Sequence, residues 1–277
     1  MVLRLTRNAG ILIGWVLFHV LPKRRNIVQT NIKLAYPEKT NQQIEELSRK
    51  NFQHYGTILA EILFFRKKKY FQNLIKIERP HIIQNALLKK RGVILMSAHL
   101  GNWEVGLHAF KLHFPPFYVV AREIKSVWAS YVMKKFRTRY GVEVVPAKNS
   151  YRMMLQLLRE NKIIGFAYDQ HHGKRGIYVD FFGQPAATSP GIAMLARETG
   201  AVVIPTFNYR NPDGSFTLTC DLPMYYIQTD NPEFDLFNNT QIFTKKIEEW
   251  VRKFPQQWFW LHRRWKGRQN YYDESRG

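Results

Sequence analysis

The sequence is short of cysteine, of acidic residues and of long apolar runs. Its single cysteine, Cys220, cannot form an intramolecular disulfide or supply a cluster of cysteine ligands for a metal. This excludes an oxidised, disulfide-built extracellular scaffold and fits a reducing compartment. No run of about 18 uncharged apolar residues occurs, so a conventional membrane-spanning helix is not predicted.

Acidic residues are outnumbered by basic ones, with 21 Asp and Glu against 42 Lys and Arg, which gives a formal net charge of +21. Such a surface attracts polyanions, but composition leaves open whether these are nucleic acid, anionic lipid, a phosphorylated substrate or an acidic carrier protein. The 45% of hydrophobic residues exclude disorder, and 277 residues suit one large domain or two small ones.

The longest apolar stretch covers residues 9–21 (AGILIGWVLFHVL), and as a helix it reaches about 20 Å, less than the hydrocarbon core of a bilayer. Arg4 and Arg7 precede it and three basic residues follow at 23–25, an arrangement that favours a helix in an anionic interface. We therefore expect an uncleaved membrane anchor over residues 1–25. The alternatives are a buried first helix and a cleaved signal peptide, for which no small-residue cleavage site follows.

A helical lead-in is predicted for residues 26–90. Thr40 and Gln43 have the spacing of a capping box, and apolar residues then recur at helical spacing, which predicts a long amphipathic helix over about 41–65.

Beyond residue 91 the pattern changes to alternating strands and helices. Short β-rich runs occur at 93–96, 117–121, 142–145, 163–167 and 201–206, with helix-compatible stretches near 103–112, 127–140, 150–160 and 190–199. This predicts an α/β domain over residues 91–277, a single catalytic unit with 26–90, in which helices cover a mostly parallel central sheet.

Residues 216–220 (FTLTC) alternate like an added antiparallel strand. Cys220 is then a packed strand residue rather than a nucleophile, because no basic environment is evident for it.

The segment SAHLGNWE follows the strand 93–96 directly and precedes a helix, which places His99 at the carboxyl end of a strand. His99 and Glu104 can meet only if Gly101 and Asn102 turn the chain before the helix begins. Glu104 would then orient the imidazole, and the other ring nitrogen would take a proton from an incoming hydroxyl. Taken alone, such a pair is more often a capping or core interaction.

The HLGNWE segment at the end of a strand resembles the HX4(D/E) motif of glycerolipid-type acyltransferases, and is similar in particular to the lipid A biosynthesis (lauroyl/myristoyl) acyltransferase family. The resemblance extends through residues 22–38, 137–141 (RTRYG), 168–205 and 258–266 (WFWLHRRWK), in order along most of the chain.

The resemblance implies transfer of a fatty acyl chain from an acyl carrier protein thioester, or acyl-CoA, to a hydroxyl of an anionic lipid A precursor or related glycolipid. It implies His99 as general base, Glu104 as its orienting partner and Gly101 and Asn102 as organisers of the substrate site. It also implies the cytosolic face of the bacterial inner membrane, a membrane-surface partner, no cofactor and no metal.

Arg122 and Arg139 are, by position, the candidates to stabilise negative charge on the thioester oxygen. Either could instead pair with a sugar phosphate or be a solvated surface charge.

Asp169 follows the strand 163–167 and, with Gln170, corresponds to a DQ pair of the family, for which substrate binding or loop organisation is implied. His171 and His172 beside it do not favour a metal site, since adjacent histidines do not easily face one ion.

Two aromatic segments admit more than one interpretation. Residues 179–188 could border an acyl-chain cleft or form a hairpin that packs its aromatics on the sheet. Trp258, Trp260 and Trp265 are interleaved with cations, a pattern that suits nucleic acid. Trp258 and Trp260 also alternate with Phe259 and Leu261 as a buried strand would, which favours packing in the core. A basic nucleic-acid-binding protein without catalysis is therefore the alternative function.

Overall fold

A computed structural model describes residues 2–64, 74–121, 142–147 and 149–268. The helices are α1 (Val2–Val20), α2 (Pro22–Ala35), α3 (Asn41–Phe64), α5 (His81–Leu88), α6 (Trp103–His113), α8 (Tyr151–Arg159), α9 (Gly191–Thr199) and α10 (Pro232–Lys253), with short 3₁₀ turns η1 (Gly173–Arg175) and η2 (Pro255–Gln257). The strands are β1 (Ile75–Glu78), β2 (Val93–Ser97), β3 (Phe117–Ala121), β4 (Glu143–Pro146), β5 (Ile163–Ala167), β6 (Ile177–Phe181), β7 (Gln184–Thr188), β8 (Val202–Arg210) and β9 (Phe216–Cys220).

The central sheet has seven strands in the order β1-β9-β8-β2-β5-β3-β4. The strands from β8 to β4 run parallel, and β9 joins β8 antiparallel with β1 parallel to β9. The prediction of an α/β fold with a mostly parallel sheet and an added antiparallel strand at 216–220 is therefore confirmed. The helix expected near 127–140 lies outside the described residues.

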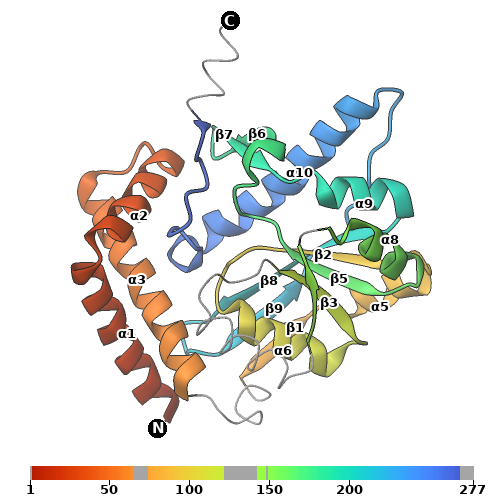
Figure 1. The fold of residues 1–277 in the computed structure, drawn as a ribbon. Coiled ribbons are helices and arrows are strands. Elements are labelled where there is room, and N and C mark those ends of the chain that lie inside the picture. Colours follow the sequence, from red (N-terminus) through yellow and green to blue (C-terminus); the bar gives the residue numbers. More distant parts are fainter. Residues whose placement is uncertain (1, 65–73, 122–141, 148, 269–277) are drawn as a thin grey trace, which may run out of the picture.

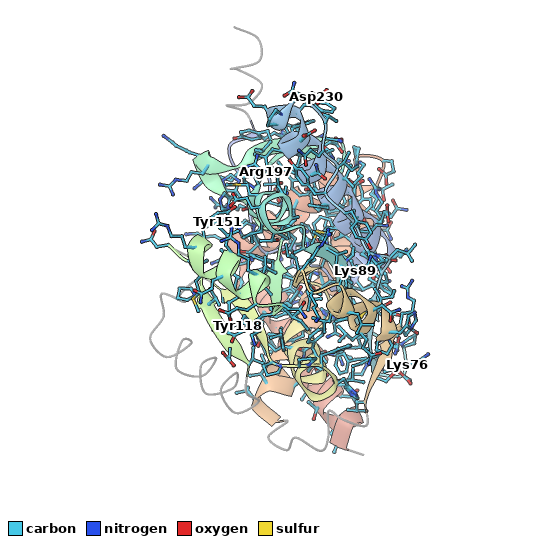
Figure 2. The ribbon with its side chains drawn as sticks, turned by 90° about the vertical axis from the view of Figure 1, so that its right-hand side faces the viewer. Lys76, Lys89, Tyr118, Tyr151, Arg197 and Asp230 are labelled. Atoms are coloured by element: carbon cyan, nitrogen blue, oxygen red, sulfur yellow. The ribbon has the colours of Figure 1, made fainter. Side chains whose placement is uncertain are left out.

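Helices cover both faces of this sheet, because the central strands are apolar on both sides. Side chains of α5 and α6 pack on one face, with Ile83 and Phe110 among the buried residues. Side chains of α8, α9 and α10 pack on the other face. Tyr151, labelled in Figure 2, links two of these helices through a hydroxyl that donates to Glu198 at 2.8 Å.

The first three helices lie together on one side of the molecule, drawn in red and orange in Figure 1. Helices α1 and α3 touch backbone to backbone: a Cβ on Gly10 would lie 2.3 Å from Cα of Thr57, and one on Gly56 would lie 2.2 Å from O of Gly10. Only residues without side chains allow this approach.

One face of α1 is therefore buried and the other is exposed. Phe18 is buried, whereas the exposed apolar residues of α1 are Leu5, Leu12, Trp15, Val16 and Val20. No single helix in the described residues is long and apolar enough to cross a membrane, but the bent pair 5–20 and 22–35, with 95° between its parts, meets the length and composition together.

The capping box and the long helix of the lead-in are confirmed. The backbone N–H of Thr40 donates to Oε1 of Gln43 at 2.9 Å, and that of Gln43 donates to Oγ1 of Thr40 at 3.3 Å, directly before α3. The lead-in is not all helical, because β1 at 75–78 pairs with β9 as the edge of the central sheet. Helix α2 crosses residue 25, and the domain boundaries at 25 and 90 stay predictions.

Residues 179–188 lie in the β6–β7 hairpin, whose aromatic side chains Phe181 and Phe182 are buried. They pack against the C-terminal tryptophans, with Phe181 stacked on Trp265 at 5.7 Å between ring centroids. The segment therefore forms the hairpin that was predicted, with its aromatic side chains packed on the C-terminal tryptophans.

The C-terminal tryptophans are buried, as core packing requires, but their backbone does not form the strand that the alternation suggests. Trp258 and Trp260 lie in a series of turns whose carbonyl groups accept from side chains of the N-terminal helices. Nδ2 of Asn31 donates to O of Trp260 at 2.7 Å, and Nδ2 of Asn51 donates to O of Trp258 at 2.7 Å. These amides take the place of a neighbouring strand, and the buried rings cannot stack on nucleic-acid bases.

Candidate active site

The loop from Ser97 to Asn102 turns sharply between β2 and α6. Gly101 has φ +61°, and a Cβ there would lie 2.2 Å from O of Asn208 on β8, so any side chain is excluded. The N–H of Gly101 donates to O of Gln257 at 3.1 Å. The turn that the sequence predicted before the helix is therefore present, and the C-terminal segment holds it in place.

Asn102 begins α6 and connects the loop to two distant elements. Its Oδ1 accepts from N of Val105 at 3.3 Å, which caps the helix, and its Nδ2 donates to Oε2 of Glu61 on α3 at 2.9 Å. Glu61 is buried and accepts two bonds from the guanidinium of Arg210 on β8, each 2.6 Å long. Arg210 compensates the buried charge of Glu61 and holds its carboxylate in place. The hydrogen bond to this carboxylate then fixes Asn102 and the start of α6.

His99 hydrogen-bonds a carboxylate that the sequence analysis assigned to another role. Its Nδ1 lies 2.8 Å from Oδ1 of Asp169, and its backbone N–H donates to Oδ2 of Asp169 at 2.9 Å. An ionised carboxylate only accepts, so Nδ1 carries the proton and Nε2 is the basic nitrogen.

Parallel strand register brings these two residues together. Ser97 of β2 stands opposite Ala167 of β5, and His99 and Asp169 each lie two residues beyond those ends. The N–H of Tyr168 donates to O of Ser97 at 2.8 Å, which continues the pairing into the loops. Carboxyl ends of neighbouring parallel strands are where α/β folds assemble their sites.

Asp169 is buried and ionised. Nε1 of Trp258 donates to its Oδ2 at 2.7 Å, in addition to the bonds from His99. Burial raises the pKa of this carboxyl, but the charge and hydrogen bonds of His99 and the Trp258 indole outweigh burial and lower the pKa to about 2.

Glu104 occupies the first turn of α6, where it is buried and accepts from Nε1 of Trp103 at 3.2 Å. It lines the same cavity as His99. The sequence analysis expected Glu104 to orient the imidazole, whereas the carboxylate at Nδ1 is Asp169. A role for Glu104 in the reaction stays a prediction.

Gln170 follows Asp169 and lies against the imidazole. Its Nε2 is 3.5 Å from both ring nitrogens of His99, which places the amide across the ring rather than at one nitrogen. Gln170 and Asp169 therefore both contact His99, so the structure joins the DQ pair to the HLGNWE loop. Arg122 and Arg139, the candidate oxyanion or phosphate ligands, lie outside the described residues.

Arg264, one of several cations in residues 258–266, supports the site from behind. It is fully buried behind the DQ pair, and its Nη1 donates to O of Ala187 at 2.8 Å and to O of Gln170 at 3.4 Å. Burial lowers the pKa of its guanidinium to about 10, against the charge of Asp169. Arg264 is charged at neutral pH and ties the Gln170 loop to β7, a role that its sequence context did not indicate.

A cavity of about 690 Å³ opens beside His99. Polar residues in its lining include His99, Glu104 and Gln170, and its walls are largely apolar, with contributions from Leu95, Val119 and Phe117. Such a cavity suits a long apolar ligand with a polar reacting end. Among the residues that the structure describes, no group of three or more His, Cys, Asp or Glu side chains could hold a metal ion.

Cys220 lies in β9 and is fully buried, and burial raises the pKa of its thiol to about 12. A thiol held protonated in this way is a poor nucleophile, as expected of a packed strand residue.

Comparisons with known proteins agree on one family. Residues 2–267 match the model of the bacterial lipid A biosynthesis acyltransferases. The chain is similar to a lipid A biosynthesis lauroyltransferase of Escherichia coli, with 27% identity over 94% of this chain and 84% of that one. It is also similar to a lipid A biosynthesis palmitoleoyltransferase of Escherichia coli, with 25% identity over the same shares.

More distant similarities reach other acyltransferases. A phosphatidylinositol mannoside acyltransferase of Mycolicibacterium smegmatis is 28% identical over 65% of this chain and 59% of that one. The crystal structure of the 1-acyl-sn-glycerophosphate acyltransferase of Thermotoga maritima aligns over 91% of this chain and 99% of that chain, with 14% identity and a TM-score of 0.40. Because the family model spans nearly the whole chain, the protein belongs to the bacterial lipid A biosynthesis acyltransferase family and is an acyltransferase.

Proposed function

We propose that the protein moves a fatty acyl chain from an acyl carrier protein thioester to a hydroxyl of a lipid A precursor or a related glycolipid at a membrane surface. Family membership supports acyl transfer to a glycolipid. The names of the relatives, which include lipid A and phosphatidylinositol mannoside acyltransferases, support a sugar-containing lipid as the acceptor.

In the proposed reaction His99 is the general base. Its Nε2 removes the proton of the acceptor hydroxyl while the oxygen attacks the thioester carbonyl carbon. The tetrahedral intermediate collapses to an ester, and the departing thiolate takes the proton from the imidazolium to leave as a thiol. Asp169 keeps the proton on Nδ1 beforehand and stabilises the imidazolium between these steps.

A single observation supports this proposal most directly: His99, hydrogen-bonded to the buried Asp169, lines a largely apolar cavity. Transfer between two substrates needs no nucleophile from the protein, only a base placed where a hydroxyl and a thioester meet. The acyl chain would enter the cavity between β3, β5 and α6, which places its carboxyl end beside His99.

The charge of the chain supports an acidic carrier as the donor. Lys174 and Arg175 in η1 are exposed and follow His172, which lines the cavity. A carrier protein of negative charge would be steered toward such cations, and the encounter rate would fall as salt rises.

The exposed face of α1 supports attachment to a membrane surface. It presents Leu12, Trp15 and Val20 with exposed fractions of 62%, 50% and 60%, and Lys23 and Arg24 follow directly. An apolar face beside cations is typical of a helix that lies in an anionic interface. The bent pair of α1 and α2 has the length and composition of a broken span, so the depth of insertion is a question for experiment.

Mass spectrometry of lipid products tests donor and acceptor together. The wild-type protein is incubated with an acyl carrier protein pool or with acyl-CoA, and with a phosphorylated lipid A precursor or a total membrane lipid extract. A mass gain of one acyl chain on the precursor, faster from the carrier protein, is the expected result. Gain only in the extract would refute lipid A as acceptor, and a faster reaction from acyl-CoA would refute the carrier protein as the preferred donor.

A further inference from the structure

Strand β5 has a glycine at its centre, where a side chain would ordinarily pack. Gly165 has the sequence neighbours Ile164 and Phe166 in a five-residue strand, and glycine weakens a strand interior because it adds flexibility and packs nothing. Its φ is not positive and no turn requires it. The backbone conformation therefore does not explain the glycine, and the reason lies in its surroundings.

The space beside Gly165 is open on the cavity side. Among the residues that the structure describes, a Cβ built there would meet O of Tyr118 at 3.8 Å and Cγ2 of Val119 at 3.9 Å and nothing closer, and both are ordinary van der Waals contacts. Most other glycines in this fold lack such room; a Cβ on Gly56 or Gly101 would lie within 2.3 Å of backbone. A side chain at 165 is therefore sterically possible.

Gly165 lies in the wall of the cavity rather than at its mouth. It pairs with Leu95 of β2 on one side and Val119 of β3 on the other, and all three line the cavity. Ala167 lies two residues nearer the loop end, about 7 Å along the strand, and Phe117 lies at the level of Ile163, about 7 Å deeper. Because Gly165 has no side chain, it leaves a notch in the cavity wall, midway between the end of the cavity at His99 and the end at Phe117.

We propose that Gly165 sets the longest acyl chain that the cavity accepts, an inference that rests on the proposed acyl transfer. The chain passes the notch to reach the space next to Phe117. A valine or leucine at 165 would project between Leu95 and Val119 and close the passage, so only the methylenes nearest the thioester would still be buried. Long chains would lose the contacts of every methylene beyond the notch, while short chains would lose none.

The size of the effect follows from the cost of exposing methylenes. Each buried CH₂ contributes about 0.8 kcal/mol, so each methylene that a new side chain excludes lowers kcat/KM about fourfold. Three excluded methylenes would then lower kcat/KM for a long donor by roughly sixtyfold, with little change for a short donor.

The experiment measures kcat/KM for a graded series of saturated acyl thioesters with the wild type, Gly165→Ala, Gly165→Val and Gly165→Leu. Ala167→Val is the matched control, because it adds the bulk of a side chain on the same strand face at the mouth. We expect the optimum to move to shorter chains in the order Ala, Val, Leu. The control is expected to change all lengths by a similar factor.

An unchanged length profile in folded Gly165→Val and Gly165→Leu would overturn the inference, as would the same shift in the control. Thermal unfolding identifies a variant that fails to fold, in which case Gly165→Ala, which adds one methyl group, provides the comparison. Inactivity of the wild type with every donor would refute the proposed acyl transfer itself, and this inference with it.

Discussion

Replacing Asp169 with asparagine is the substitution that probes the site most sharply, because it keeps the shape of the side chain and removes its charge. Asp169 receives three donors: Nδ1 and the backbone N–H of His99, and Nε1 of Trp258. An asparagine has one acceptor oxygen. If that oxygen faces Trp258 and the backbone N–H, its NH₂ group faces Nδ1, and the imidazole must move its proton to Nε2. Nε2 can then no longer act as a base.

Two effects set the magnitude, the loss of the charge and the change of tautomer. Burial raises the pKa of the Asp169 carboxyl, yet the interactions with His99 and Trp258 lower it from 3.8 to about 2. Loss of this charge removes the carboxylate that stabilises the imidazolium as it forms. The wrong tautomer adds to this loss, and a total of about a thousandfold or more in kcat is expected.

The assay is the initial rate of acyl transfer by the wild type, Asp169→Asn and Glu104→Gln, with thermal unfolding of each to confirm that it is folded. Glu104→Gln is the matched comparison, since it neutralises a different carboxylate, one that lines the cavity. A folded Asp169→Asn variant with a kcat within tenfold of wild type would refute the assignment of Asp169 as the partner that positions and charges His99.

Three further predictions concern stability and attachment. The lowered pKa of Asp169 stabilises the native state above a pH of about 3.8, and this stability is lost as the pH falls toward 2. Asp169→Asn should therefore be less stable than wild type by about 2 kcal/mol at neutral pH and equal to it below pH 2. Urea unfolding at several pH values checks this, and a pH-independent difference would contradict it. Gly56→Leu should force α1 away from α3 and lower the melting temperature by about 5 °C or more, whereas the exposed change Leu59→Ala should leave it nearly unchanged; equal melting temperatures would contradict the close packing. The double variant Leu12→Asp with Trp15→Glu should float less with anionic vesicles than wild type, while Leu222→Glu, a change at an exposed leucine in the loop after β9, should not; undiminished flotation of the double variant would exclude this face of α1.

The strands and the position of His99 could be predicted because the information is local. The apolar run 93–96 followed by HLGNWE places His99 at a strand end, and the structure has β2 and the turn at Gly101 where the pattern predicts them. The contact between His99 and Asp169 is not local information, because it depends on which strand lies beside β2. Strand order is set by packing across the whole chain, so the sequence indicated Glu104, five residues away, and could not show that the register of β2 with β5 brings Asp169 to His99.

The C-terminal segment shows the same limit. Trp258 and Trp260 alternate as in a strand, but Asn31 and Asn51, more than 200 residues away in the sequence, bind the carbonyl groups that a strand would need for pairing. The burial of Arg264 has no local signal either, since its environment comes from β7 and the loop at Gln170. Alternation therefore predicted that the tryptophans are buried, but the form of the backbone depended on contacts between distant residues.

The most direct test of the central claim is mass spectrometry of lipid products after parallel incubation of the wild type and His99→Ala with acyl carrier protein thioesters and a phosphorylated lipid A precursor. We expect a gain of one acyl chain on the precursor with the wild type and none with His99→Ala, and thermal unfolding checks that this variant is folded. Equal product from a folded His99→Ala protein would contradict the account.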